Sequence, residues 1–283
     1  MSDAPAFGDR VRGALGERGP LCVGIDPHEH LLRAWELDAS AAGVREFGLR
    51  TVDAAAGRAG IVKPQVSFFE RYGSAGFAAL EDVLAAARAA GLLVIADAKR
   101  GDIGTTMDAY TRAWLTPGSP LEADAITVSP YLGVLSLVDT FRFALAHGKG
   151  VFVLAATSNP EAHAQQRAIV GGERTIAAEI TREVSGFNAV STVPGEWASI
   201  GFVIGATVDW ADAGLPAQIA PIAPILAPGF GHQGAKPGEL AGLFGSAASA
   251  VIASESRSLL AAGPDGLAAA IDARVREYRS SHG

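Results

Sequence analysis

Short apolar runs recur along the chain, and longer stretches with helical periodicity separate them. About eight such runs are present, and nearly all are continuous rather than alternating with polar residues. Continuous runs predict strands that are buried on both faces, as in a parallel sheet covered by helices. The runs begin near Leu21, Ile61, Leu92, Asp124, Gly150, Ile200, Ile222 and Ala248, and the second is read as GIVKPQVSFF, residues 60–69.

Between the runs, apolar residues recur at the three- and four-residue spacing of an amphipathic helix. In the segment 77–91, Phe77, Leu80 and Leu84 share a face, and Gly91 is expected to end the helix. The segments 171–190 and 264–279 show the same pattern, through Ile176, Ile180 and Val184 in the first and Leu267, Ile271 and Val275 in the second.

Alternating strands and helices without a linker-like break predict one α/β domain over residues 1–283, a (β/α)₈ TIM barrel. The alternative is an open, doubly wound sheet, and the number of strands distinguishes the two. An N-terminal segment with Phe7, Val11 and Leu15 four residues apart is expected to cover one end of the barrel.

Composition narrows the possible partners. The chain has 283 residues, of which 49% are hydrophobic, so it can bury a large core, and its net charge is −7. No basic stripe is present, which argues against nucleic acid as a partner. The N-terminus lacks the apolar region of a signal peptide, and no apolar run is long enough to span a bilayer. We therefore expect a cytoplasmic protein without a membrane partner, in which Cys22 is a buried and inert thiol.

A dense charge cluster follows the third apolar run, in the stretch VIADAKRGDIGTT, residues 94–106. Asp97 and Lys99 are two residues apart and would share a face of a strand, and Asp102 follows in the next loop. In a barrel, such strand ends face the active site. A lysine between two carboxylates is held in its charged form, which suits a cation and proton donor better than a nucleophile. Arg100 is expected to be a solvated or structural partner.

Two other strand ends carry charge. Asp26 ends the first run, and Lys63 interrupts the second. Taken singly, Asp26 is as well explained by a turn or helix cap, and Lys63 by an aliphatic stem that reaches solvent. Together with the third strand, they predict a ring of alternating carboxylates and ammonium groups.

The segment GFGHQG, residues 229–234, matches the glycine pattern of dinucleotide-binding folds, but too little chain follows it for such a domain. Glycines still allow backbone N–H groups to approach an anion. By our count the segment follows strand seven and Arg257 follows strand eight, where barrels bind phosphate. Gln233 and Arg257 would be the side-chain donors. No metal constellation stands out, since His28 and His30 have no evident third ligand.

With these residues assembled, the sequence resembles the orotidine 5′-phosphate decarboxylase family, in its longer bacterial, mycobacterial-like subgroup. The resemblance runs from strand one to strand eight, although D-x-K-x-x-D alone also occurs in related phosphosugar barrels. At the end of strand eight the usual Gly-Arg reads Ser256-Arg257. The matching residues are Asp97, Lys99, Asp102, Ile103 and Thr106 after strand three, Asp26 and Lys63 on strands one and two, Ser158 after strand five, Pro228, Gly229, Gly231 and Gln233 after strand seven, and Arg257.

The resemblance implies decarboxylation of orotidine 5′-phosphate to UMP and CO₂, the last step of de novo UMP synthesis, without a metal or organic cofactor. It implies Lys99, Asp97 and Asp102 as catalytic residues and the other matching residues, apart from Gly231, as substrate contacts. It also implies a homodimer in which Asp102 and Ile103 reach the neighbouring subunit's site. Two alternatives remain: a Mg²⁺-dependent phosphosugar decarboxylase or aldolase, and a non-catalytic sensor of nucleotides or phosphosugars.

Overall fold

Eight parallel strands close into a barrel in the computed structural model, which describes residues 5–280. The strand order around the barrel is β1-β10-β9-β8-β5-β4-β3-β2. Closure confirms the predicted TIM barrel and rules out the open sheet. The barrel strands are β1 (Leu21–Ile25), β2 (Ile61–Pro64), β3 (Leu93–Arg100), β4 (Ala125–Val128), β5 (Gly150–Ala156), β8 (Ile200–Ile204), β9 (Ile225–Pro228) and β10 (Val251–Glu255).

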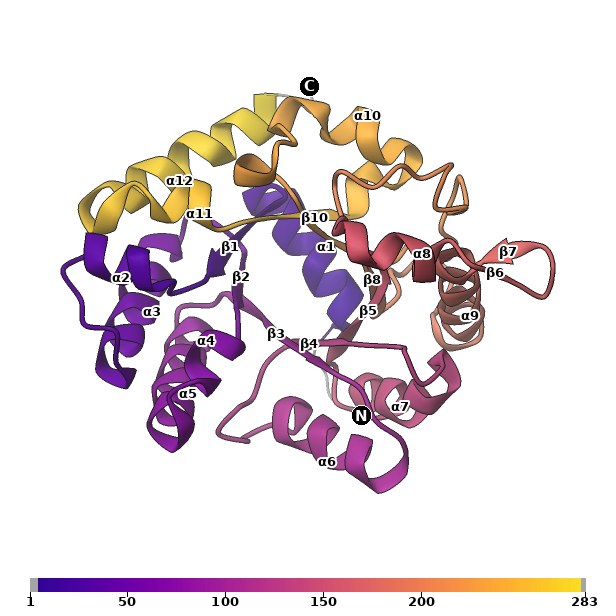
Figure 1. The fold of residues 1–283 in the computed structure, drawn as a ribbon, viewed down its shortest axis with the longest axis horizontal. Helices are drawn as coiled ribbons and strands as arrows, with labels where there is room; N and C mark the ends of the chain where they lie inside the picture. Colours follow the sequence, from indigo (N-terminus) through magenta and orange to yellow (C-terminus); the bar gives the residue numbers. More distant parts are fainter. Residues whose placement is uncertain (1–4, 281–283) are drawn as a thin grey trace.

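Helices surround the barrel (Figure 1) and cover the outward side chains of its strands. The outer layer consists of α2 (Glu29–Ala34), α3 (Ala41–Ala55), α4 (Ser67–Glu70), α5 (Gly73–Ala89), α6 (Gly104–Leu115), α7 (Val138–Ala146), α8 (His163–Gln166), α9 (Ile176–Ser191), α10 (Leu240–Phe244), α11 (Arg257–Leu260) and α12 (Gly263–Ser280). Short 3₁₀ helices are η1 (Val134–Leu137), η2 (Pro160–Ala162), η3 (Gly231–Gln233), η4 (Pro237–Glu239) and η5 (Gly245–Ala250).

The N-terminal helix α1 (Phe7–Arg18) covers the end of the barrel where the strands begin, as the sequence predicts. In Figure 1 it is the indigo helix that crosses the centre of the ring. Phe7 packs edge-on against Phe152, with ring centroids 5.9 Å apart. At Gly150 a Cβ would lie 2.1 Å from the Phe7 ring, so glycine is required there. Because this end is covered, the opposite end, where the strands finish, is left for a site.

Two segments differ from the prediction. The run over residues 60–69 is a strand only to Pro64, with one further bridge between Gln65 and Asp97, and its second half forms α4. The start of the segment 171–190 is not helical: Gly171 and Gly172, at φ 64° and 79°, form the tip of a small hairpin. That hairpin, β6 (Ile169–Val170) with β7 (Arg174–Thr175), projects from the ring in Figure 1.

Within residues 5–280, no helix combines the length and the apolar character that a membrane span requires.

Candidate active site

The charged side chains of β2 and β3 meet in one network. Lys63 Nζ donates a hydrogen bond to Asp97 Oδ2 at 2.9 Å, and Lys99 Nζ donates one to Asp97 Oδ1 at 2.5 Å. Lys63 and Asp97 are buried, whereas 46% of the Lys99 side chain is exposed. One carboxylate therefore neutralises a buried ammonium group and orients a second one that faces open space.

Burial by itself disfavours the charged forms of both buried groups. For Asp97, Lys63 and Lys99 outweigh that effect and hold the pKa of the carboxyl group well below its ordinary value. For Lys63, burial is outweighed by Asp97 and Asp26, which raise the pKa of the ammonium group above its ordinary value. Both groups are therefore charged at neutral pH.

The end of β3 is not a regular strand. It advances from Ala96 to Arg100 while the neighbouring β4 advances only from Ile126 to Val128. Inside this bulge Lys99 has a left-handed φ of 48°, which residues other than glycine rarely adopt. Bulges beside active sites redirect side chains. Lys99 does meet the carboxylate two residues before it, as predicted, but through this bulge rather than through regular strand alternation.

A cavity of about 240 Å³, here called the site cavity, opens above this network at the ends of the strands. Gln65, Thr157, Phe230 and His232 also line it. It therefore joins the charged network to the glycine segment after β9 and to the residues after β10. The predicted site residues that line it are Asp26, Lys63, Asp97, Lys99, Pro228, Gly229, Gln233 and Arg257.

Two polar atoms of the site cavity are buried without a partner. Asp26 Oδ1 and Ser256 Oγ make no hydrogen bond within residues 5–280. Most buried polar groups in folded proteins are hydrogen-bonded, so such exceptions call for an explanation. Both atoms belong to residues that line the cavity, where a polar ligand would supply the missing partners.

Four predicted site residues lie outside the site cavity as far as the described chain shows. Asp102 is half-buried in the loop after β3, and its Oδ1 accepts a hydrogen bond from the Ile103 backbone N–H at 2.8 Å. Ile103 is 61% exposed and Thr106 is exposed on the first turn of α6. Ser158 lies beside Gly205, one residue beyond the cavity-lining Thr157.

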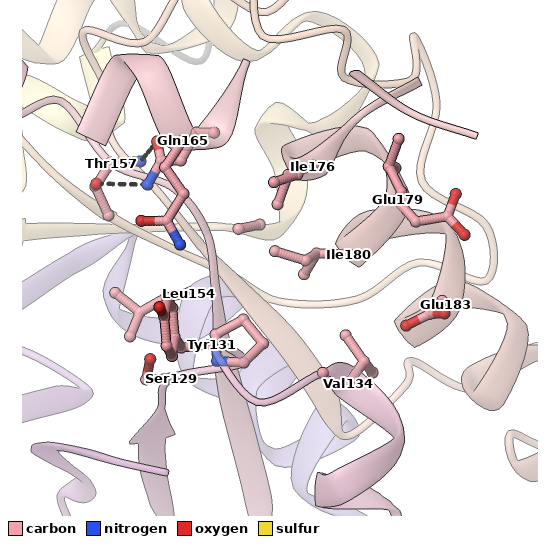
Figure 2. A pocket seen from close by; sticks show the side chains of 15 residues that line it. Ser129, Tyr131, Val134, Leu154, Thr157, Gln165, Ile176, Glu179, Ile180 and Glu183 are labelled. Carbon is pink, nitrogen blue, oxygen red and sulfur yellow. Dashed lines mark hydrogen bonds between the residues drawn. The ribbon is translucent and has the colours of Figure 1, made fainter. Parts of the chain in front are cut away.

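A second cavity of about 410 Å³, the side cavity, adjoins the first and shares Leu154 and Thr157 with it. Figure 2 shows Ile176 and Ile180 of α9 facing it. Gln166, which also lines this cavity, bonds both the backbone N–H and the hydroxyl group of Thr157, at 2.9 and 2.8 Å. The side cavity is larger, but the facing lysines and the glycine segment belong to the site cavity, which is therefore the candidate active site.

Some site residues were missed by sequence reasoning. Thr127 of β4 bonds Asp97 Oδ1 at 2.9 Å, and Gln65 Nε2 bonds the Asp97 carbonyl oxygen at 3.3 Å. Each left a signal. Gln65 follows Lys63 by two residues, and Thr127 is a polar residue within an apolar strand next to the charged one. For Ser256, the sequence shows only a departure from the Gly-Arg of the family pattern.

Glu255, at the end of β10, packs against the glycine segment at Gly231. It is 1% exposed, and its carboxylate accepts hydrogen bonds from the hydroxyl groups of Tyr278 and Ser258, each at 2.8 Å, and pairs with Arg274. A Cβ at Gly231 would lie 2.5 Å from Glu255 Oε2. This glycine is thus required for close packing between η3 and the end of β10.

Three lesser expectations concern Cys22, Arg100 and the histidines. Cys22 is fully buried, and burial raises the pKa of its thiol to about 12, which confirms the inert thiol. Arg100 is a structural partner, bonding Glu70 at 2.7 Å. No group of three or more His, Cys, Asp or Glu side chains within residues 5–280 is arranged to hold a metal ion.

Residues 19–271 match the model of the "Orotidine 5′-phosphate decarboxylase / HUMPS family". The chain belongs to this family. An orotidine 5′-phosphate decarboxylase of Salinispora arenicola is 49% identical over 278 residues, 98% of each chain. One of Corynebacterium efficiens is 48% identical over 259 residues, 92% of this chain and 91% of its own.

Solved structures agree in fold with this family member. One from Streptomyces avermitilis is 44% identical and superimposes with a TM-score of 0.93 over 99% of this chain and 97% of its own. The OMP decarboxylase of Leishmania donovani is 31% identical, with a TM-score of 0.77 over 98% of both chains.

Proposed function

We propose that this protein converts orotidine 5′-phosphate to UMP and CO₂. The observation that carries the proposal is the site cavity itself. It joins a carboxylate held between two lysines to a glycine segment and an arginine suited to a phosphate group. Membership of the orotidine 5′-phosphate decarboxylase / HUMPS family supports orotidine 5′-phosphate as the phosphorylated substrate.

The proposed reaction requires electrostatic stabilisation of a carbanion. Loss of CO₂ from C6 of the pyrimidine leaves a carbanion without a conjugated electron sink, so a fixed positive charge near C6 lowers the barrier. Lys99 would supply that charge and then the proton that converts the carbanion to UMP. Asp97 would face the departing carboxylate, and their repulsion would be relieved as CO₂ leaves.

The remaining residues would bind the substrate. Asp26, whose buried Oδ1 lacks a partner within the described chain, would accept from a ribose hydroxyl group, with Lys63 beside it. Gln233 and Arg257 would hold the phosphate with backbone N–H groups near Gly229. Pro228 would line the pocket, and Ser158 would contact the pyrimidine. The phosphate is remote from C6, so its binding energy would support the chemistry at a distance.

A homodimer is part of the proposal, with Asp102 and Ile103 contributed to the neighbouring subunit's site. The loops after β3 and β4 adjoin, since the Ser129 N–H donates to the Arg100 carbonyl oxygen at 2.8 Å. These loops and η1 expose large apolar side chains, which supports an interface at this end of the barrel. The exposed residues are Ile103, Tyr131, Leu132 and Leu135.

A decarboxylation assay tests the function. Loss of orotidylate absorbance should follow addition of the purified protein and should be the same with and without EDTA. A reaction that EDTA abolishes would favour the Mg²⁺-dependent phosphosugar class, and no turnover with tight UMP binding would favour a sensor.

A further inference from the structure

We infer that Thr127 is a positioning residue of this site, because its single hydroxyl group holds both the backbone of Lys99 and the carboxylate of Asp97. The inference deepens the proposed function and rests on it, since both partners are proposed catalytic residues. Thr127 is 1% exposed and lies in β4, beneath the charged network.

The two hydrogen bonds have a defined direction. The Lys99 backbone N–H donates to Thr127 Oγ1 at 2.9 Å, and Thr127 Oγ1 lies 2.9 Å from Asp97 Oδ1. A hydroxyl group has one hydrogen, and an ionised carboxylate can only accept. Thr127 therefore accepts from the amide and donates to the carboxylate, so both its donor and its acceptor capacity are used at the site.

Thr127 lies where the strand ladder is interrupted. The regular pairing of β3 with β4 stops at Ala96 and Ile126 and resumes at Arg100 and Val128. The Lys99 amide falls within this gap, and a side-chain oxygen replaces the ladder carbonyl. An amide left unpaired inside a protein is strongly unfavourable. Thr127 thereby allows the bulge that gives Lys99 its left-handed backbone.

The same hydroxyl group fixes the carboxylate. Asp97 Oδ2 is held by Lys63, while Oδ1 is shared by Lys99 and Thr127. The Thr127 donor restrains rotation of the carboxylate about its last bond, so that Oδ1 stays directed at Lys99 Nζ. A β-branched residue suits this task because its χ1 is stiff and it fits a strand.

Three variants separate positioning from packing. Thr127→Val keeps the shape and removes both hydrogen bonds, while Thr127→Ser keeps the hydroxyl group. The matched control is Thr140→Val, since Thr140 is equally buried and bonds the Thr111 hydroxyl group at 2.8 Å outside the site. Each protein is assayed for kcat and KM with orotidine 5′-phosphate, UMP affinity and melting temperature.

We expect Thr127→Val to lower kcat by about a hundredfold, because small displacements of catalytic groups have effects of that size. KM and UMP affinity should stay within about twofold of wild type, since the ribose and phosphate contacts are elsewhere. Thr127→Ser should recover most of kcat, and Thr140→Val should keep it. If Thr127→Val does not fold, Thr127→Ala removes the same bonds and takes its place.

The inference is overturned if the valine variant, or the alanine variant in its place, keeps wild-type kcat, or if kcat falls only in proportion to UMP affinity. Hydrogen exchange of the peptide that contains Lys99 gives a readout that needs no substrate. Exchange should be faster in Thr127→Val than in wild type, and unchanged exchange also overturns the inference. An inactive wild-type protein would instead refute the proposed function, so the two failures are distinguishable.

Discussion

Lys63 Nζ lies 2.9 Å from Asp97 Oδ2, and both side chains are more than nine-tenths buried. Asp97 also bonds Lys99, which is partly exposed, so a buried ion pair and an exposed cation share one carboxylate. The stability of the barrel and the orientation of the proposed proton donor therefore depend on the same side chain.

Asp97→Asn should destabilise the protein, because it removes the carboxylate charge that is hydrogen-bonded to the buried Lys63 ammonium group. Breaking a buried ion pair costs about 3–5 kcal/mol. The control is Asp108→Asn, since Asp108 pairs with Arg112 on the exposed surface and should contribute little. Denaturant unfolding at neutral pH measures both, and equal midpoints for wild type and Asp97→Asn would contradict the prediction.

The stabilising effect of Asp97 should depend on pH. Its pKa in the folded state is depressed below the ordinary value of 3.8, so its contribution is present above that pH and is lost as pH falls further. The difference in unfolding free energy between wild type and Asp97→Asn should therefore shrink below about pH 4. If this difference in unfolding free energy stays constant from pH 6 to about pH 3, the ionised Asp97 carboxylate is not what stabilises the protein.

Lys99→Ala should remove the proposed cation and proton donor together. We expect kcat/KM to fall by at least about a thousandfold, given the size of such electrostatic contributions. Lys149→Ala is the control, because Lys149 also pairs with a carboxylate, that of Glu122 at 2.7 Å, and lies buried outside the site. That variant should lose stability but keep its turnover, and near-normal turnover in Lys99→Ala would refute the mechanism.

Mixed dimers test the proposed sharing of sites. Asp102→Asn chains and Lys99→Ala chains should each be inactive alone and should recover some activity when mixed, because some heterodimer sites would draw both wild-type residues. Activity is measured after subunit exchange has been shown with labelled chains. Exchange without recovery would assign Asp102 to its own subunit's site.

Arg257→Ala should weaken binding of the phosphate dianion through loss of a charge-assisted contact. KM for orotidine 5′-phosphate should rise at least about thirtyfold, and kcat should fall somewhat if phosphate binding also closes the site. On orotidine, which lacks phosphate, Arg257→Ala should be little worse than wild type. The exposed Arg276 provides the control variant Arg276→Ala. If Arg257→Ala impairs turnover of orotidine 5′-phosphate and of orotidine equally, Arg257 has a structural role.

Ser256→Ala should separate binding from stability. Ser256 Oγ is buried and unpartnered within the described chain, so its removal should not lower the stability of the free protein. UMP affinity should nevertheless fall by about tenfold if the hydroxyl group bonds the ligand. Ser258→Ala is the comparison, because that hydroxyl group already donates to Glu255 and its loss should lower stability. Unchanged UMP affinity in Ser256→Ala would remove Ser256 from the binding site.

Much of the fold follows from local pattern. Continuous apolar runs separated by amphipathic segments specify a covered parallel sheet, and the closed barrel confirms this. The N-terminal cover was predictable because Phe7 and Val11 lie on one helical face. The hairpin β6–β7 was missed, since two-residue strands carry no periodicity and Gly171 and Gly172 were read with the helix that follows.

At the site, the sequence alone determined which charged residues end the strands, since Asp26, Lys63, Asp97 and Lys99 interrupt or close apolar runs. Only the tertiary structure decided how they pair. The bond from Lys63 to Asp97 and the one from Lys99 to Thr127 each cross between strands about 30 residues apart, with distances and register that barrel closure sets. Local pattern records which face a residue occupies, but contacts between strands depend on how the whole sheet closes, bulges included.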